Sequence, residues 1–536
     1  MDKTLQANTL THPSHSTSAC PACGSISLQS EAVREPPSAA LLKLLQSNNL
    51  PSDVERVELI ATASTWTSQI SDLDQDIAQV QATLKALVLK RSGVSQNLND
   101  VKSTLHPIRS ISDSILREIF LRCVKGWDDF VTATTAHNSL DSKHPPWTLS
   151  QVSHQWRHVA LSTPRLWSSI SLNFYAQRSD EDLSWSFKFG IHLQRAGHSQ
   201  LVLRISSHKD IAKQPIMPML LTSMSQWGRL RVGMPFASFS PLSLSATYLN
   251  SLVQLIIDDP SSGYHPCKID TFRIAPAIVD LKTSPRIAPY LDLPWKNLIN
   301  FQCEGLHSDR NLQLLRKFES VEKLCLRFSS CGAGCGRLRE EVVLPRVKFL
   351  KLSEGDDYAK TTIVDFFSKA KLPSLTTLIL IYNHHGKLDF PVIDAASCPG
   401  LQTLDIRCNR SHHAENPKRI AAFLSTTLNI SSLTICANGL NKVVISELVR
   451  QEGESDAMPY LRVLDLRGSE ITVRHELIVN MVLSRCRELD GAGGMHVLLE
   501  KLCLDEPLVL KDLRVASRWE EAAEQGLHVC YGKDSD

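Results

Sequence analysis

The sequence lacks several features that would assign a function directly. Its 536 residues carry 58 Lys and Arg against 56 Asp and Glu, a formal net charge of +2. This balance argues against a dedicated nucleic-acid-binding protein, because such proteins carry a strong excess of basic residues. No apolar run approaches the roughly 18 residues that a membrane-spanning helix needs, so we expect no membrane partner. Residues 1–15 are polar and contain no signal-peptide core, so we expect a cytoplasmic or nuclear protein.

Sequence motifs of catalysis are also missing. The chain contains no Walker loop, dinucleotide-binding glycine motif or nucleophile elbow, and His475-Glu476 lacks the second His of a zinc-protease motif. We therefore expect a non-catalytic protein with no cofactor and no metal. Cys20 and Cys23 have the spacing of a zinc pair, but no small enclosing fold is evident around them, and zinc there stays an open alternative. The 14 cysteines are scattered, which predicts reduced and mostly buried thiols.

What the chain does contain is a repeat. From about residue 250 an apolar residue, two spacers, a second apolar residue, one spacer and a third apolar residue recur, as in Leu252-Leu255-Ile257. Successive middle residues are 20 to 31 positions apart, close to the period of leucine-rich repeats. They are Leu255, Leu281, Phe301, Leu324, Leu350, Leu378, Leu404, Leu433 and Leu464.

Each closing apolar-x-apolar pair predicts a short strand with alternate side chains directed inward. The sequence thus predicts an α/β leucine-rich-repeat solenoid over residues 171–510, with one curved parallel sheet and return segments on its outer side. We expect Asn383, Asn409 and Asn438 to bond backbone groups of the turns, and residues 511–536 to form a helical cap and a frayed tail. An ordinary α/β domain with leucine-rich strands is the alternative.

Upstream, residues 59–105 show apolar positions at alternating steps of four and three, with Arg91 as one polar member. Such a heptad pattern over about six heptads is typical of a coiled coil. We expect a coiled-coil helix over residues 52–105, which either forms a homodimer through residues 59–105 or packs along its own chain. Residues 1–51 are rich in Ser, Thr and Pro and predict disorder, apart from a short Leu-rich helix at residues 41–45.

Between the heptads and the repeats lie two short amphipathic segments. Ser112 or Asp113 is a plausible N-cap for the first, and the second ends before Thr163-Pro164. The segments are separated by a polar insertion at residues 126–146. The motif residues are Pro107, Ile108, Ile119, Phe120, Val152, Trp156, Arg157, Leu166 and Trp167.

These residues resemble the F-box, a module of about 50 residues and three packed helices, which we place at residues 106–170. The order of heptads, F-box and leucine repeats resembles the large family of F-box proteins of mushroom-forming fungi, in which Ala160 to Trp167 and Leu293-Pro294-Trp295 are typical phrases. Two features depart from the family pattern. Ser153 stands where the family usually has Cys, and the insertion is longer.

The resemblance implies a substrate-recognition subunit of a cullin–RING ubiquitin ligase of the SCF type. Its F-box would bind the Skp-type adaptor of the cullin ligase core, and its repeats would bind a target protein. The alternative is an adaptor-independent scaffold built on the same repeats. The residues expected to contact the adaptor, some of which must form internal core, are Pro107, Ile108, Ile111, Ile115, Leu116, Ile119, Phe120, Leu149, Val152, Trp156, Val159 and Trp167. Target contacts are expected at the outward strand positions Lys323, Lys351, Thr377, Gln402, Asp405 and Arg462.

Overall fold

A computed structural model describes most of the chain and divides it into two units, residues 1–110 and 111–536. The described residues are 38–47, 49–132, 137–176, 182–244, 249–259, 268–306, 312–328, 338, 340–355, 362–383, 385–393, 397–408, 413–427, 429–450, 458–486, 498–510, 512–524 and 526–532. The Cys20–Cys23 pair therefore lies outside the described residues.

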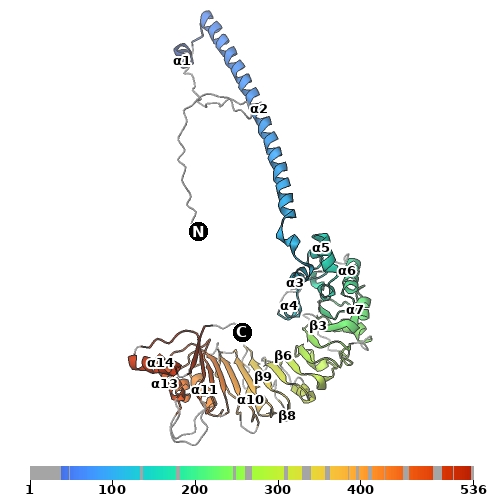
Figure 1. Cartoon of the computed structure of the whole chain (residues 1–536), viewed down its shortest axis with the longest axis vertical. Helices are drawn as coiled ribbons and strands as arrows, with labels where there is room; N and C mark the ends of the chain where they lie inside the picture. Colours follow the sequence, from blue (N-terminus) through green and yellow to red (C-terminus); the bar gives the residue numbers. More distant parts are fainter. Residues whose placement is uncertain are drawn as a thin grey trace. The chain divides into compact units, whose positions relative to one another are not determined.

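The first unit contains one long helix. Helix α2 (Asp53–Thr104) runs for 52 residues without interruption (Figure 1). Ser52 and Glu55 cap its start, because the Ser52 hydroxyl accepts from the Glu55 amide and the Glu55 carboxylate accepts from the Ser52 amide. The prediction of one continuous helix is confirmed. A shorter helix, α1 (Ala39–Gln46), includes the short Leu-rich helix expected at residues 41–45, and the Ser38 hydroxyl caps it by accepting from the Leu41 amide.

The second unit is built on one parallel sheet of 14 strands, in which sheet order follows chain order. The strands stand side by side along an arc (Figure 1). They are β1 (Ser169–Asn173), β2 (Leu201–Ser206), β3 (Trp227–Gly233), β4 (Gln254–Ile257), β5 (Asp280–Thr283), β6 (Asn300–Leu306), β7 (Lys323–Phe328), β9 (Phe349–Glu354), β11 (Thr377–Tyr382), β12 (Thr403–Cys408), β13 (Ser432–Ala437), β14 (Val463–Asp465), β15 (Lys501–Leu504) and β16 (His528–Tyr531). Strands β8 (Val342–Val343) and β10 (Ala370–Lys371) form a small parallel pair. The mixed α/β class and the long N-terminal helix are confirmed.

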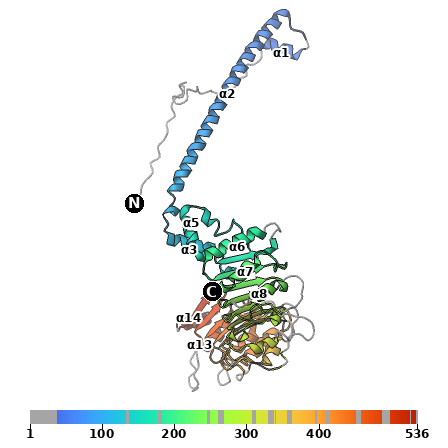
Figure 2. The ribbon, with the colours of Figure 1, turned by 90° about the vertical axis from the view of Figure 1, so that its right-hand side faces the viewer.

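Helices and 3-10 turns return the chain from one strand to the next. Helices α6, α7 and α8 pack in succession, as seen in Figure 2, and α11 to α14 do the same near the C-terminus. The helices of this unit are α3 (Asp113–Cys123), α4 (Trp127–Thr132), α5 (His154–Leu161), α6 (Asp182–Ala196), α7 (Met217–Ser223), α8 (Ser240–Leu244), α10 (Thr362–Phe367), α11 (Asn416–Leu424), α12 (Lys442–Glu447), α13 (His475–Cys486) and α14 (Leu513–Glu524).

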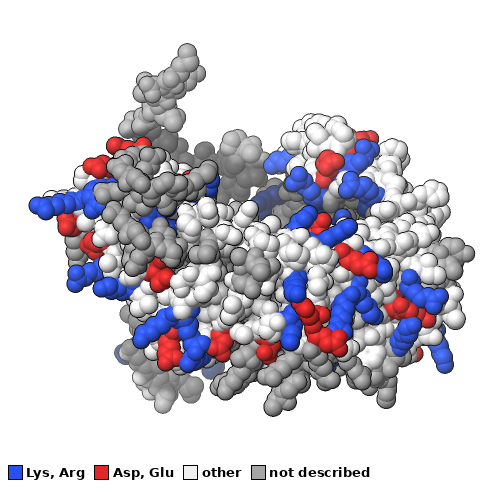
Figure 3. Space-filling model, turned by 90° about the horizontal axis from the view of Figure 1, so that it is seen from below, with Lys and Arg blue, Asp and Glu red and all other residues white. Residues whose placement is uncertain are grey.

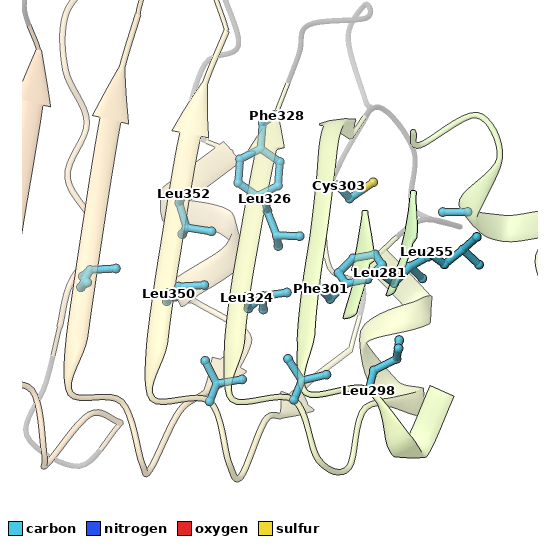
Figure 4. Packing of buried hydrophobic residues seen from close by; sticks show 14 of the residues in the cluster. Leu255, Leu281, Leu298, Phe301, Cys303, Leu324, Leu326, Phe328, Leu350 and Leu352 are labelled. Atoms are coloured by element: carbon cyan, nitrogen blue, oxygen red, sulfur yellow. The ribbon is translucent and has the colours of Figure 1, made fainter. Parts of the chain in front are cut away.

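A row of apolar side chains in register holds the sheet to its return segments. Leu255, Leu281, Phe301, Leu324 and Leu350 are successive partners on β4 to β9 and line up in Figure 4. The row continues through β11 to β15. The expected inward positions Leu255, Leu324, Leu378 and Leu464 have no exposed surface, so this prediction is confirmed.

Asn383 and the C-terminal segment are the next features of the repeat region. Asn383 shares the parity of the outward residues of β11, and its amide donates to the Ser353 hydroxyl at 3.4 Å. Asn409 lies outside the described residues. The expectation of a frayed tail after α14 is wrong, because residues His528–Tyr531 form strand β16. This strand pairs in parallel with β15 and is the last strand of the sheet.

The helical segment before β1 shares the core of the sheet. Leu116 and Phe120 of α3 belong to the same continuous cluster of buried residues as the sheet leucines. The Trp147 and Trp167 rings pack edge to face, with centroids 5.2 Å apart. Buried His192 of α6 lies 5.3 and 5.2 Å from those rings. The α3–α5 segment therefore packs as the first layer of the second unit, before β1.

Leu350 and Lys351 test the register, because they are neighbours on β9 that lie on opposite faces. We expect Leu350→Ala to lower the free energy of unfolding by about 2–5 kcal/mol, since it opens a cavity in a fully buried row. Lys351→Ala is the matched control and should change it by less than about 0.5 kcal/mol. Urea denaturation of both variants measures the difference, and equal losses would contradict the register.

Acid should weaken the junction around His192. Burial lowers the pKa of His192 to about 4, the nearby charge of Arg195 adds to this, and a bond to the Trp167 carbonyl opposes it. In the unfolded chain this pKa is about 6.5, so between the two values the unfolded state binds more protons. The stability contribution is thus complete above pH 6.5 and is lost as the pH falls towards 4.

The matching experiment compares wild type with His192→Phe, which keeps a ring between the two tryptophans. We expect the unfolding free energy of wild type to fall on the order of 3 kcal/mol more than that of the variant between pH 6.5 and pH 4. Urea titrations at a series of pH values give both curves. Parallel curves for the two proteins would show that His192 is not responsible.

Candidate functional site: an apolar helical surface and a cationic sheet face

Helix α3 has two apolar faces. Leu116 and Phe120, four residues apart, are fully buried, and the Phe120 ring packs 4.9 Å from that of Trp156 on α5. Ile115 and Ile119 have the same spacing one residue earlier and leave 54% and 41% of their surface exposed. Helical spacing thus places one apolar pair in the core and the other on the surface. A second apolar face on so short a helix is typical of a docking surface.

The start of α5 lies against the start of α3. The Gln155 side-chain amide donates to the Ile111 carbonyl at 3.2 Å and to the Asp113 carboxylate at 2.9 Å. Ser153 caps α5 by accepting from the Trp156 amide at 3.2 Å. Ser153, the residue that departs from the family pattern, therefore has a structural use. Val152 precedes this cap and is a further exposed apolar residue, with 60% of its surface accessible.

The structure sorts the twelve residues expected to contact an adaptor. The exposed ones in the second unit are Ile115, Ile119 and Val152, whereas Ile111, Leu149 and Trp156 are partly buried against the core. Pro107 and Ile108 belong to the first unit and are exposed there. Four expected contacts are wrong, because their side chains are fully buried and hold the module together: Leu116, Phe120, Val159 and Trp167.

The long insertion between the two helical segments covers one end of the sheet. Trp127 and Phe130 of α4 form a small apolar cluster with Ile256, an outward residue of β4. The Arg231 guanidinium of β3 donates to the Phe130 and Val131 carbonyls and pairs with Asp258. These contacts hold α4 over the outer face near β3. The sheet face beyond this point carries the remaining outward residues.

A hollow of about 570 Å³ lies on that outer face across β6, β7, β9 and β11. Its lining combines basic and apolar groups. The Lys323 ammonium lies 5.2 Å from the centre of the Phe349 ring, a cation–π distance, and Lys351 lies on the neighbouring strand. The other lining residues are Gln302, Cys303, Glu304, Cys325, Leu326, Arg327, Ser353, Ile379, Ile381 and Asn383.

The hollow has an excess of positive charge. At its edge the Glu304 carboxylate pairs with Lys282 at 2.9 Å, and this pairing lowers the Glu304 pKa. Among the described residues no carboxylate lies within ion-pair distance of Lys323 or Lys351. Two ammonium groups beside Phe349 and Ile379 can bind a carboxylate next to an apolar side chain. An acidic peptide segment with one large apolar residue fits this chemistry.

The six residues expected to bind a target are only partly on this surface. Lys323 and Thr377 occupy one outward row with Phe349, and Lys351 and Asp405 occupy the next. Asp405 is buried in a pair with Arg407 at 2.8 Å, so it does not face a partner freely. Gln402 and Arg462 lie one residue before β12 and β14, at the corners, and Arg462 pairs with Glu500. The expectation of outward strand positions is wrong for these two.

Sequence reasoning missed Phe349, Ile381 and Arg327 in the lining of the hollow. Each has the outward parity of its own strand. Phe349 is a spacer within its repeat, and Arg327 and Ile381 lie one residue after the last apolar position of theirs, so parity alone could have indicated them. Only the lateral register places the three side chains in one hollow. That register joins segments separated by more than twenty residues in the chain.

Two features of the described residues bear on reactivity, namely the cysteine thiols of the sheet and the side chains that could bind a metal ion. Burial raises the pKa of the Cys325 and Cys303 thiols, and it raises that of Cys408 to about 12. Thiols with raised pKa values are weak nucleophiles at neutral pH. In the described ranges no three His, Cys, Asp or Glu side chains gather as metal ligands.

Two general surface properties complete the description. On the face shown in Figure 3, basic and acidic side chains are interspersed, and neither sign forms one continuous field. None of the described helices combines the length and apolar character needed to cross a bilayer.

No family model matches the sequence, and no curated protein is similar to it.

Proposed function

We propose that the protein is the substrate-recognition subunit of a cullin–RING ubiquitin ligase of the SCF type. In this proposal the F-box comprises residues 106–170, and the leucine-rich repeats follow it at residues 171–510. In this proposal the exposed apolar surface of α3 and α5 binds a Skp-type adaptor, and the outer sheet face binds a target protein. The chain itself is not an enzyme and works in the cytoplasm or the nucleus.

One observation carries the proposal above the others. Ile115 and Ile119 expose an apolar face on α3, beside the face on which Leu116 and Phe120 are fully buried. A helix that is apolar on both faces needs a second partner, because leaving such a face in water costs about 25 cal/mol for each Å². The position of this face, directly after the heptads and before the repeats, agrees with the F-box resemblance.

The second support is the continuity of the core. Since α3, α5 and the strand leucines belong to one buried cluster, the two proposed binding surfaces lie on one body. A rigid connection lets an adaptor-bound ligase hold a target at a defined position. The high local concentration of target lysines near the bound E2 then promotes ubiquitin transfer without chemistry on this chain.

The adaptor proposal predicts the effect of Ile115→Ala with Ile119→Ala. Removing both side chains should weaken adaptor binding by about 2 kcal/mol or more, a dissociation constant at least roughly thirtyfold higher. Calorimetric titration of the purified full-length chain with a purified Skp-type adaptor measures this. The melting temperature should stay close to that of wild type, because both residues lie on the surface.

A matched control is available on α6. Leu183 and Phe187 are also an exposed apolar pair four residues apart, so Leu183→Ala with Phe187→Ala removes a similar surface elsewhere. Adaptor binding should be unchanged in this control. No measurable adaptor binding by wild type would favour the adaptor-independent scaffold, and equal losses in both variants would exclude α3 as the specific contact.

The target proposal predicts that Lys323→Glu with Lys351→Glu reverses the charge of the hollow. After proteasome inhibition, some proteins with acidic segments should co-purify with wild type. The captured amount of these proteins, measured by quantitative mass spectrometry, should be at least tenfold lower with the variant. Adaptor binding should persist. Lys213→Glu with Lys418→Glu makes the same charge change at exposed positions away from the hollow and should keep those proteins. Unchanged capture by the Lys323/Lys351 variant would contradict the assignment of the hollow.

A further inference from the structure

Helix α2 carries an apolar stripe that the described residues of its unit leave largely exposed. The helix has no buried residue. The heptad positions fall on one side. Leu59 is half-buried, and the large apolar members from Trp66 to Leu98 keep 43% to 60% of their surface exposed. A stripe this regular is complementary to a second helix with the same period.

The charges of α2 are divided between its two halves. Residues 53–78 contain six acidic side chains and one basic one, whereas residues 79–104 contain four basic side chains and one acidic one. Two copies aligned in parallel would bring like charges together in both halves. Two copies aligned in opposite directions bring the acidic half of each beside the basic half of the other.

We propose that α2 forms an antiparallel two-stranded coiled coil with α2 of a second copy of this chain. This inference does not depend on the proposed ligase role. One register satisfies the whole stripe. Ile77 then faces the second copy's Val80, Leu84 faces its Leu73, and Leu59 faces its Leu98. In that register every interior position from Leu59 to Leu98 meets one of the opposite heptad class, as antiparallel packing requires.

The single polar member of the stripe supports the same direction. In the antiparallel register Arg91 faces Trp66 of the second copy, and a guanidinium over an indole ring is a favourable cation–π pair. A parallel dimer would place Arg91 against Arg91 and Trp66 against Trp66 in the interior.

The direction of pairing decides whether a charge reversal in the acidic half weakens or strengthens the dimer. Asp74 and Asp76 flank the stripe in the acidic half, so Asp74→Lys with Asp76→Lys should raise the dimer dissociation constant of the full chain at least tenfold in 50 mM NaCl. In a parallel dimer the same change relieves repulsion and lowers the constant. Ser68→Lys with Gln75→Lys is the control in the same buffer, because both positions lie on the far side of the helix from the stripe and their charge acts on the second copy from a greater distance.

Sedimentation velocity of the full chain measures these constants, and circular dichroism verifies that each variant keeps its helix. Wild type should sediment with twice the 59.7 kDa mass of one chain, and its affinity should fall as salt rises. A wild-type monomer at every concentration tested, or tighter dimerisation of the Asp74/Asp76 variant, would overturn the proposal.

A cross-linking experiment reads the direction independently. A benzophenone amino acid replaces Trp66 in the full chain, and equal amounts of isotopically light and heavy protein are mixed before irradiation. Light–heavy cross-links from position 66 to the segment around Arg91 are expected. Cross-links to the segment around position 66 mean a parallel dimer, and cross-links confined to one chain mean that α2 packs on its own protein. Either result would overturn the proposal.

Discussion

The second unit depends on one lateral constraint, the register of its parallel strands. Leu255, Leu324 and Leu464 occupy the same inward row although more than two hundred residues separate the first from the last. Because the side-chain period of a strand is two, a shift by one residue would move the whole row into solvent. Burial of the row therefore holds every strand at the same height. The outward-facing side chains of neighbouring strands are aligned by the same register, which the buried row sets.

The helical segment before β1 uses the same core and so becomes part of the same body. Trp167 and His192 connect it to the sheet, and the Trp167 indole donates to the Ala160 carbonyl at 2.9 Å. The insertion that follows α3 returns over the sheet as α4 and covers outward residues near β3. One end of the outer face is thereby used in folding, and the hollow beginning at β6 lies beyond it.

The proposed binding surfaces consist of residues that are not buried in the folded core. Leu116 and Phe120 are buried in the core, whereas Ile115 and Ile119 on the same helix are exposed and can contact an adaptor. Lys323 and Lys351 face outward beside apolar groups, while Asp405 on the same face is already paired with Arg407. The first unit has a separate property, since α2 has no buried residue and its halves have opposite charge. Association through α2 can therefore be tested without reference to the other surfaces.

The sequence by itself determined the periodic elements, because hydrophobic period is a local property. The heptads predicted the continuous helix α2, and the apolar-x-apolar pairs predicted strands with Leu255, Leu378 and Leu464 inward. The tertiary structure was needed to show which residues of the segment 106–170 are core, that Asp405 is paired, and that residues 528–531 add β16 to the sheet. Each of these depends on contacts between distant segments. Such contacts are set by packing and by the register of neighbouring strands, which no local pattern encodes.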